Sequence, residues 1–481
     1  MLFSSPVFLF LFLPILLLFY FTIGRKFPNL SLIIASLVFY FWGEPDFITF
    51  LLVAVAFNFF LGLLIQKYLK KKSIAKKILF LSILLNLGFL IYYKYWVFLI
   101  QNFNTFFTFL IRNLTTVPGY DFNLSVPKIW LPLAISFFTF HAISYNVDIF
   151  RKKAEAQKNP FSLLLYFLFF PHLLAGPIVR YHSIAGQLKK RVIYFDDFVF
   201  GVERFISGLA KKVLIADKLN PIVNEIFSIP TEHLGASVAW VGIICFTLQI
   251  YFDFSGYSDM AIGLARMFGF SFPENFNYPY ISTSITEFWR RWHITLSSWF
   301  RDYLYIPLGG SRVSALKRYF NLWTVFILVG VWHGASWNFI AWGILQAVFL
   351  SLERFNNGVL FKSLWLPFKH LYTLLALISG WVLFRSENLT KAFSYLQVLF
   401  GLKKEGIIFQ PAGYFLQMDI ILVMIVGVIC SIPVSSYFRK FRSNFEVRFK
   451  LLKLAALTGL LFLIAISVAS KTYNPFLYFR F

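Results

Sequence analysis

The sequence predicts an all-α, polytopic membrane protein, and three observations lead to this fold class. Of the 481 residues, 59% are hydrophobic, only 14% are charged and 64 are phenylalanine, an apolar content far above that of soluble domains. Roughly eleven to thirteen stretches approach the ~20 apolar residues with which a helix crosses the hydrocarbon layer. The basic residues gather in short segments between these stretches, as is typical of cytoplasmic loops.

The predicted spans begin close to the first residue. The first 23 residues carry no charge and therefore lack the basic start of a cleaved signal peptide, which favours a retained first span. The clearest predicted spans are residues 6–23, 47–65, 129–147, 234–252, 420–438 and 454–470.

The charge balance predicts the orientation of the chain. Lysine and arginine number 45 against 21 acidic residues, which gives a net charge of +24. In a soluble protein this excess suggests nucleic acid, but here it follows the positive-inside rule, so we expect membrane lipids and no nucleic-acid partner. The rule predicts an N-terminus outside, with Arg25–Lys26, 67–77 and 151–158 inside and 43–46 and 115–127 outside.

The common templates for cofactor and metal binding are absent from the sequence. It has no Walker loop, no dinucleotide fingerprint, no HExxH pair and no serine nucleophile elbow. Its two cysteines, Cys245 and Cys430, lie far apart in apolar runs without metal-ligand spacing, which favours packing roles. We therefore expect no bound cofactor and no metal.

A basic, aromatic helix is predicted from Ser284 to about Tyr305. Ser284 and Glu287 form an S-x-x-E capping box, and Pro307 follows the expected end. A simple interfacial anchor is one interpretation of such a helix, but a histidine with no acid on its face favours the wall of a cavity. Residues at helical spacing share one face, namely Trp289, His293, Leu296 and Phe300, and Arg290, Arg291 and Arg301 surround it.

The stretch GVWHGASWN (330–338) places His333 in an uncharged run, 319–352. This run is too long for one span and too short for two full spans with a turn, so we expect a break at Gly334. An arm of residues 319–332 is then about 21 Å long and leaves His333 at membrane depth. An ionisable group at that depth predicts a functional site, and a neutral histidine hydrogen-bonded between helices is the alternative.

The chemistry open to this imidazole is narrow. Without a catalytic serine, a reactive cysteine or a metal cluster, it acts either as a general base on a hydroxyl or as a proton relay. A relay in a transporter usually adds buried carboxylates, whereas Asp148, Asp253, Asp259 and Asp419 lie at or near the ends of apolar runs. A transporter or flippase without chemistry stays open as a different class of function.

Two long motifs resemble the signature of the membrane-bound O-acyltransferase (MBOAT) family. They are NFNYPYISTSITEFWRRWHITLSSWFRDYLYIPLGG (275–310) and LVGVWHGASWNFIAWG (328–343), and FFPHLLAGPIVRY (169–181) and NPFLYFRF (474–481) agree as well. The bacterial polysaccharide O-acetyltransferase branch, alginate-type, is the most similar. The resemblance covers essentially the whole chain.

The resemblance implies an MBOAT-like ring of roughly 11–13 transmembrane or re-entrant helices around a central tunnel. The chain is then one integral membrane domain, 1–481. Its signature core is expected at about 130–400, with N-terminal spans in 1–129 and C-terminal spans in 401–481.

The resemblance also implies roles for single residues. His333 matches the histidine taken as the catalytic base, and His293 matches the second signature histidine. The arginines suit an anionic thioester carrier, although positive-inside anchoring explains them equally well. Tryptophan and asparagine side chains with purely structural roles would look the same in the sequence. The expected tunnel or substrate residues are Trp332, Trp337, Asn338, Arg290, Arg291, Arg301 and Trp289.

The implied function is transfer of an acyl group, first of all acetyl, from a cytoplasmic thioester to hydroxyls of an exported cell-surface polysaccharide. The expected donor is acetyl-CoA or an acyl carrier protein. An outward-facing polysaccharide, or a periplasmic or extracellular acyltransferase partner, receives the group. Transfer of D-alanyl from a carrier protein and peptidoglycan O-acetylation are the alternatives, and the expected location is the bacterial cytoplasmic (inner) membrane.

Overall fold

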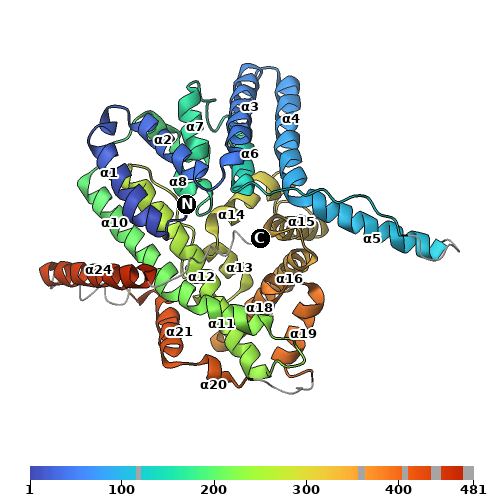
Figure 1. Cartoon of the computed structure of the whole chain (residues 1–481). Coiled ribbons are helices and arrows are strands. Elements are labelled where there is room, and N and C mark those ends of the chain that lie inside the picture. Colours follow the sequence, from blue (N-terminus) through green and yellow to red (C-terminus); the bar gives the residue numbers. More distant parts are fainter. Residues whose placement is uncertain (115–120, 356–362, 404–409, 435–445, 470–481) are drawn as a thin grey trace.

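The computed structural model describes the chain except for residues 115–120, 356–362, 404–409, 435–445 and 470–481, and it describes only the backbone at 446–450. Helices joined by turns and extended segments make up the described residues, and no strand occurs among them (Figure 1). The predicted all-α class is therefore confirmed. The terminal motif at 474–481 lies outside the described residues, as does part of the predicted outer segment 115–127.

The N-terminal helices form antiparallel neighbours. Helices α3 and α4 stand side by side and are joined by a basic turn around Lys71 (Figure 1). After α4 the chain passes through a π-helical turn, Ile91–Tyr95, and α5 projects away from the body (Figure 1). The bounds are α1 Leu13–Phe21, α2 Pro28–Phe41, α3 Ile48–Lys67, α4 Lys72–Leu90, α5 Trp96–Leu114 and α6 Ile135–Phe150.

Helix α12 (Ala236–Met267) forms the centre of the core. It has 32 residues, most of them buried, and it packs against α10 and α11. The remaining helices are α7 Pro160–Leu168, α8 Phe170–Leu173, α9 Tyr181–Lys189, α10 Phe195–Ala210, α11 Asp217–Ser228, α13 Ile285–Arg291, α14 Ile294–Phe300, α15 Ala315–His333, α16 Trp337–Arg354, α18 Leu366–Arg385, α19 Leu389–Leu399, α20 Ala412–Phe415, α21 Met418–Cys430 and α24 Glu446–Ala469.

Buried ion pairs lie within this core. The ammonium of Lys212 contacts Asp217 at 2.9 Å and Asp253 at 2.6 Å, and Asp259 pairs with Arg204 and Lys211. The sequence-based placement of Asp253 and Asp259 at the ends of apolar runs was wrong, because α12 continues to Met267 and buries both carboxylates. A buried carboxylate is tolerated when it is paired. Lys211 and Lys212 come from the segment that joins α10 to α11, and Arg204 comes from α10 itself.

Five described helices are long and apolar enough to cross a membrane: Pro45–Lys67, Lys72–Leu114, Ala236–Met267, Leu366–Arg385 and Leu451–Ala469. Five such helices are fewer than the roughly eleven to thirteen spans predicted from the sequence, because several apolar stretches form shorter helices. The stretch at 129–147 becomes helical only at Ile135, and the helix within 420–438 ends at Cys430. Cys430 is exposed, which makes its predicted packing role wrong, whereas Cys245 is buried.

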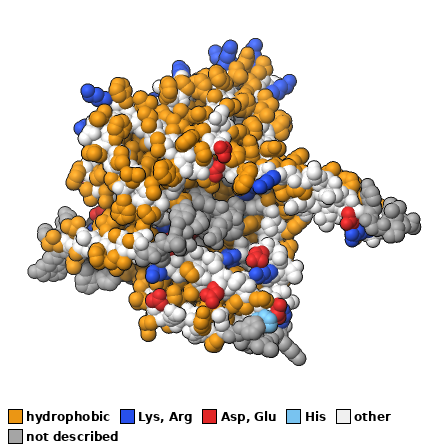
Figure 2. Space-filling view, in the orientation of Figure 1, with side chains coloured by type: hydrophobic (Ala, Val, Ile, Leu, Met, Phe, Trp, Pro, Cys, Tyr) orange, Lys and Arg blue, Asp and Glu red, His pale blue; other side chains and the backbone are white. Residues whose placement is uncertain are grey.

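Apolar side chains dominate the surface of the upper half of the molecule, and lysine and arginine side chains gather at its upper rim (Figure 2). Exposed leucine, isoleucine and phenylalanine occur along α1, α3 and α4, among them Leu18, Phe60 and Phe80. A continuous apolar surface of this kind marks contact with lipid. The chain is a helical membrane protein.

Candidate active site

His333 is the last residue of α15, and the chain breaks directly after it, as predicted. Gly334 has an extended backbone, and α16 begins at Trp337. The new helix is capped by Ser336, whose hydroxyl accepts a hydrogen bond from the backbone N–H of Asn338. The two arms of the uncharged run therefore meet at a buried corner, and His333 is only 6% exposed there.

Glycines allow the two arms to approach each other closely. A Cβ atom added at Gly330 would lie 2.3 Å from the carbonyl oxygen of Phe339, and one added at Gly343 would lie 2.4 Å from that of Phe326. Neither contact is sterically possible. The position of His333 relative to α16 thus depends on the absence of a side chain three residues earlier.

The helix predicted from Ser284 to Tyr305 is broken at His293, so that prediction was wrong in its continuity. Its start is confirmed, since Ser284 caps α13 by accepting from the N–H of Glu287. The break arises because His293 adopts a left-handed backbone with φ of 44°. A distant residue, Asn275, holds the break: its carbonyl accepts from the N–H of Ile294, and its side chain lies 3.1 Å from Nδ1 of His293.

The aromatic ring of Trp332 joins the two histidines. Its centroid lies 4.9 Å from the ring of His333 and 6.4 Å from the ring of His293. On its other side Trp332 stacks on Phe140 at 5.2 Å. Trp342 stands edge-on to His333 at 5.0 Å. Three of the sequence-predicted site residues, Trp332 and His333 at the end of α15 and His293 at the start of α14, are thereby brought into one aromatic cluster.

Several buried nitrogens in this cluster have no hydrogen-bond partner among the described residues. They are Nε2 of His293 and the indole nitrogens of Trp332, Trp342 and Trp381. A buried polar group without a partner costs about 1–3 kcal/mol, and each such group calls for an explanation such as a ligand or water. These four nitrogens beside His333 and His293 fit an interior that binds polar substrate atoms.

A first cavity of about 180 Å³ opens beside His333. His333, Trp332 and Lys94 line it together with the segment 131–137. The Lys94 ammonium donates to the carbonyl oxygen of Trp332 at 2.7 Å and to that of His333 at 3.3 Å. A cation at this position binds the free carbonyls at the end of α15 and complements its dipole.

A second cavity, of about 250 Å³, lies along the preceding turns of α15. Its apolar wall includes Trp289, Leu296 and Val329, and Val329 sits one helical turn before His333. Three arginines line it as well: Arg290, Arg301 and Arg354. His333 therefore stands where one turn of α15 separates a basic cavity from the first cavity.

Three sequence-predicted residues lie elsewhere or have other partners. Trp337 is 53% exposed, and its indole donates to Asn102 of α5 at 2.8 Å. Arg291 pairs with Glu287 at 2.9 Å and does not line the basic cavity. Asn338 is buried and donates to the carbonyl of Ser386 at 2.6 Å, which ties the start of α16 to the end of α18.

An ion-pair network adjoins the basic cavity. Asp302 accepts from Arg301 at 2.7 Å and from Arg180 at 2.6 Å. Partial burial opposes ionisation of Asp302, but the hydrogen bonds from Arg301 and Arg180 outweigh it and hold the pKa of this carboxyl below its usual range. The ionised carboxylate thus fixes Arg180, from the GPIVRY motif, against the segment that follows α14.

Sequence reasoning missed two residues that line the cavities and one pair formed by a histidine and an aspartate. Lys94 and Arg354 line the cavities, but neither belongs to a local motif that marks it. His182 had no evident partner in the sequence, yet its Nδ1 lies 2.6 Å from the buried carboxylate of Asp148, which also accepts from Tyr303. Because 34 residues separate His182 from Asp148, no spacing rule identifies the pair.

Fold and site define a helical membrane protein with a buried cluster of imidazole and indole groups, of which Trp332 and His333 line the first of two neighbouring cavities. The sequence model of MBOAT, the membrane-bound O-acyltransferase family, matches residues 133–384. The chain belongs to this family and is an O-acyltransferase.

The curated relatives include proteins of three named kinds. The chain is 42% identical over 401 residues to a probable alginate O-acetylase of Pseudomonas aeruginosa, covering 83% of this chain and 75% of that protein. It is 36% identical to a peptidoglycan O-acetyltransferase of Helicobacter pylori, covering 84% and 80%. It is 33% identical to a teichoic acid D-alanyltransferase of Bacillus subtilis, covering 51% and 65%.

Proposed function

We propose that this chain transfers acetyl groups from cytoplasmic acetyl-CoA to hydroxyls of an exported cell-surface polysaccharide, with His333 as the general base. The observation that carries the proposal is the position of His333 between two cavities on one helix, α15. The basic cavity suits the anionic thioester donor, because guanidinium groups pair with phosphate. The cavity beside Lys94 then receives the acceptor.

The reaction follows from this arrangement. The Nε2 or Nδ1 atom of His333 takes the proton of an acceptor hydroxyl while its oxygen attacks the thioester carbonyl. The C–S bond breaks, an ester bond forms, and the imidazolium returns the proton to the leaving thiolate. The indole N–H groups of Trp332 and Trp342, which have no partner among the described residues, are candidates to stabilise the oxyanion of the tetrahedral intermediate.

The proposed sidedness rests on charge. The basic cavity adjoins Arg151, whose guanidinium donates to the carbonyl of Asp302, and 151–158 is a segment that the positive-inside rule places in the cytoplasm. The first cavity adjoins 131–137, which follows the predicted outer segment. The protein thus acts in the cytoplasmic membrane with its N-terminus outside. The proposal also includes a single domain, in which a ring of helices surrounds a tunnel through His333.

The acceptor proposal follows the relatives named above. An alginate-like polysaccharide is favoured because identity to the alginate O-acetylase is higher than to the peptidoglycan enzyme, and the D-alanyltransferase matches only about half of this chain. Peptidoglycan, or a periplasmic acyltransferase partner that completes the transfer, is the alternative recipient.

Inside-out membrane vesicles containing the chain test donor and direction together. Labelled acetyl-CoA added to the exposed cytoplasmic face is expected to give ester-linked label on a polysaccharide inside the vesicles. D-alanyl loaded on a carrier protein serves as the competing donor. Label that appears only with the carrier, or none from acetyl-CoA, contradicts the proposed donor.

Arg301 is expected to contribute to donor affinity. It is exposed and lines the basic cavity, so Arg301→Ala should raise the KM for acetyl-CoA by up to about fivefold, the range of an exposed charge pair, with little change in kcat. Arg312→Ala is the matched control, because Arg312 is also exposed but lines neither cavity. If Arg301→Ala and Arg312→Ala have the same KM for acetyl-CoA, Arg301 does not contribute to donor affinity.

Lys94 is expected to support the rate of transfer. Lys94→Met removes two hydrogen bonds to the end of α15, and one bond from a charged group contributes about 1.5–3 kcal/mol, so the rate should fall at least about tenfold. Lys94→Arg should restore part of it. Lys128→Met, at an exposed lysine on the same predicted side, should have no effect; equal rates for Lys94→Met and Lys128→Met would show that Lys94 has no part in the reaction.

A further inference from the structure

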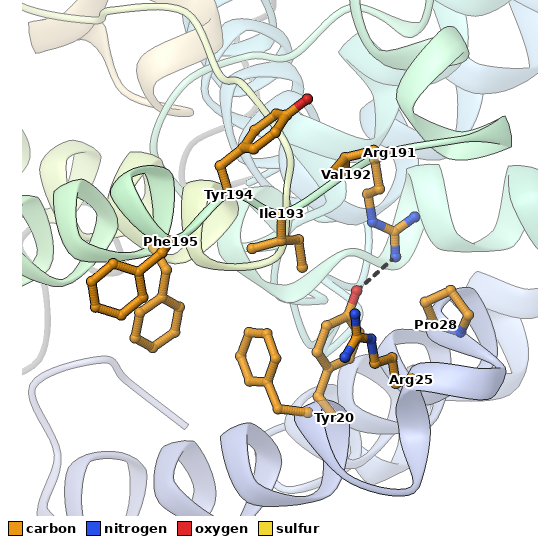
Figure 3. Close-up of a pocket in the computed structure, with 10 residues that line it drawn as sticks. Tyr20, Arg25, Pro28, Arg191, Val192, Ile193, Tyr194 and Phe195 are labelled. Atoms are coloured by element: carbon orange, nitrogen blue, oxygen red, sulfur yellow. Dashed lines mark hydrogen bonds between the residues drawn. The ribbon is translucent and has the colours of Figure 1, made fainter.

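A cavity of about 640 Å³ lies away from the candidate active site, between the end of α1 and the segment that leads into α10. Its lining has a cationic side and an apolar side. Figure 3 shows Arg25 and Arg191 on one side and Phe195 on the other, with Tyr20 below and Ile193 above. This cavity shares no lining residue with either cavity at His333.

The cationic side is built into the fold. Arg191 donates to the phenol oxygen of Tyr20 at 3.2 Å, to the side-chain oxygen of Asn29 at 2.5 Å and to the carbonyl of Phe268 at 2.9 Å. It therefore links α1, α2 and the end of α12. None of these partners is an anion, so the positive charge of the guanidinium is not neutralised by them.

Further positive charge surrounds the same opening. Arg25 is exposed, and no ion pair of Arg25 or Arg191 occurs in the described part of the chain. Lys26, Lys189 and Lys190 are neighbours of these arginines in the sequence. Asp196 and Asp197 follow Phe195 but do not line the cavity, and Asp197 pairs with Arg266 at 3.4 Å. The site thus has a net positive charge.

The apolar side is open to the surroundings. Val192 is 56% exposed, Phe195 is 78% exposed and Phe21 is 38% exposed. In a membrane protein these side chains contact lipid chains, and the arginines beside them lie at the level of the headgroups. Basic pockets between helices on the cytoplasmic side are where anionic headgroups bind.

We propose that this cavity binds one anionic phospholipid of the cytoplasmic leaflet. The phosphate pairs with Arg25 and Arg191, and an acyl chain lies along Phe21, Ile193 and Phe195. Because Arg191 already joins α1, α2 and α12, the bound lipid strengthens the contact of the N-terminal helices with the central helix. A soluble anion is disfavoured because most of the lining is apolar, and Phe21, Val192 and Phe195 in it are exposed at the surface.

Lipid retention by the purified full-length chain tests this proposal. The chain in detergent is incubated with phosphatidylglycerol or phosphatidylethanolamine of equal chain length, and bound lipid is counted by native mass spectrometry. Retention of phosphatidylglycerol should exceed that of phosphatidylethanolamine and should raise the melting temperature. Arg25→Ala should lower phosphatidylglycerol retention about fivefold, the factor corresponding to about 1 kcal/mol per basic residue at an anionic surface.

Two controls keep the result interpretable. Lys72→Ala removes an exposed lysine at the α3–α4 turn, predicted on the same side, and should leave retention unchanged. Phe195→Ser should lower retention of both lipids. If both lipids bind equally, if Arg25→Ala behaves like Lys72→Ala, or if excess inorganic phosphate displaces phosphatidylglycerol, the proposal is overturned.

In the intact chain, the preference for phosphatidylglycerol over phosphatidylethanolamine should also decrease as the salt concentration rises. A preference that does not depend on salt contradicts the proposal.

Discussion

Replacement of His333 by alanine is expected to reduce acyl transfer by about 10²–10⁴-fold, the contribution of a positioned general base. The ring lines the first cavity and lies one helical turn from Val329 of the basic cavity. Its ring neighbours Trp332 and Trp342 carry no basic nitrogen, so neither takes over its role as proton acceptor. The measurement is the initial rate of label transfer from acetyl-CoA in membranes, normalised to the amount of folded protein.

Two further variants separate chemistry from packing in this experiment. His333→Gln keeps a polar side chain of similar size but lacks a base, so it should fold and remain inactive. His370→Ala, at a half-buried histidine of α18 that lines neither cavity, should retain the full rate. If the His333→Gln protein transfers acetyl as fast as the intact chain, His333 is not the general base.

Replacement of Gly330 by alanine is expected to impair both stability and transfer. The added Cβ would meet the carbonyl oxygen of Phe339 at 2.3 Å, and backbone cannot move aside as a side chain does. Overpacking of this kind costs about 1–3 kcal/mol and displaces α15 from α16, which carries His333 out of its position. A lower melting temperature in detergent together with a lower transfer rate is the expected result.

Gly88→Ala is the matched control for this prediction. Gly88 also lies in a helix, α4, but a Cβ added there meets no atom within 4 Å. Alanine has the higher helix propensity by up to about 1 kcal/mol, so this variant should be as stable as the intact chain or more so. Equal melting temperatures for Gly330→Ala and Gly88→Ala would refute the close approach of α15 and α16.

The sequence predicts the break after His333 correctly but not the break at His293. The first follows from length alone, because 34 uncharged residues fit neither one span nor two. The second depends on Asn275, which lies 18 residues away and accepts hydrogen bonds from Ile294 and Thr295. Local capping and periodicity contain no information about such a contact, so Ser284 marks the start of α13 and nothing marks its end.

The site is predictable where its residues belong to the two long motifs. His333, His293 and Trp332 meet in the structure as those motifs imply, and Arg290 and Arg301 line one cavity with Trp289. Lys94 is not predictable, because it comes from the turn between α4 and α5 and reaches α15 across 239 residues. Trp337, four residues after the motif histidine, lies at the surface because the corner at Gly334 turns it toward α5.

Accessibility of position 333 from both membrane faces tests the central claim most directly. In a chain with Cys245 and Cys430 replaced by serine, His333→Cys is treated with a small, membrane-impermeant thiol reagent from either side of oriented vesicles. Modification from both faces, with acetyl-CoA protecting only against the reagent on the cytoplasmic side, is the predicted result. A thiol that reacts from neither face would mean that no passage reaches this residue and would contradict the account.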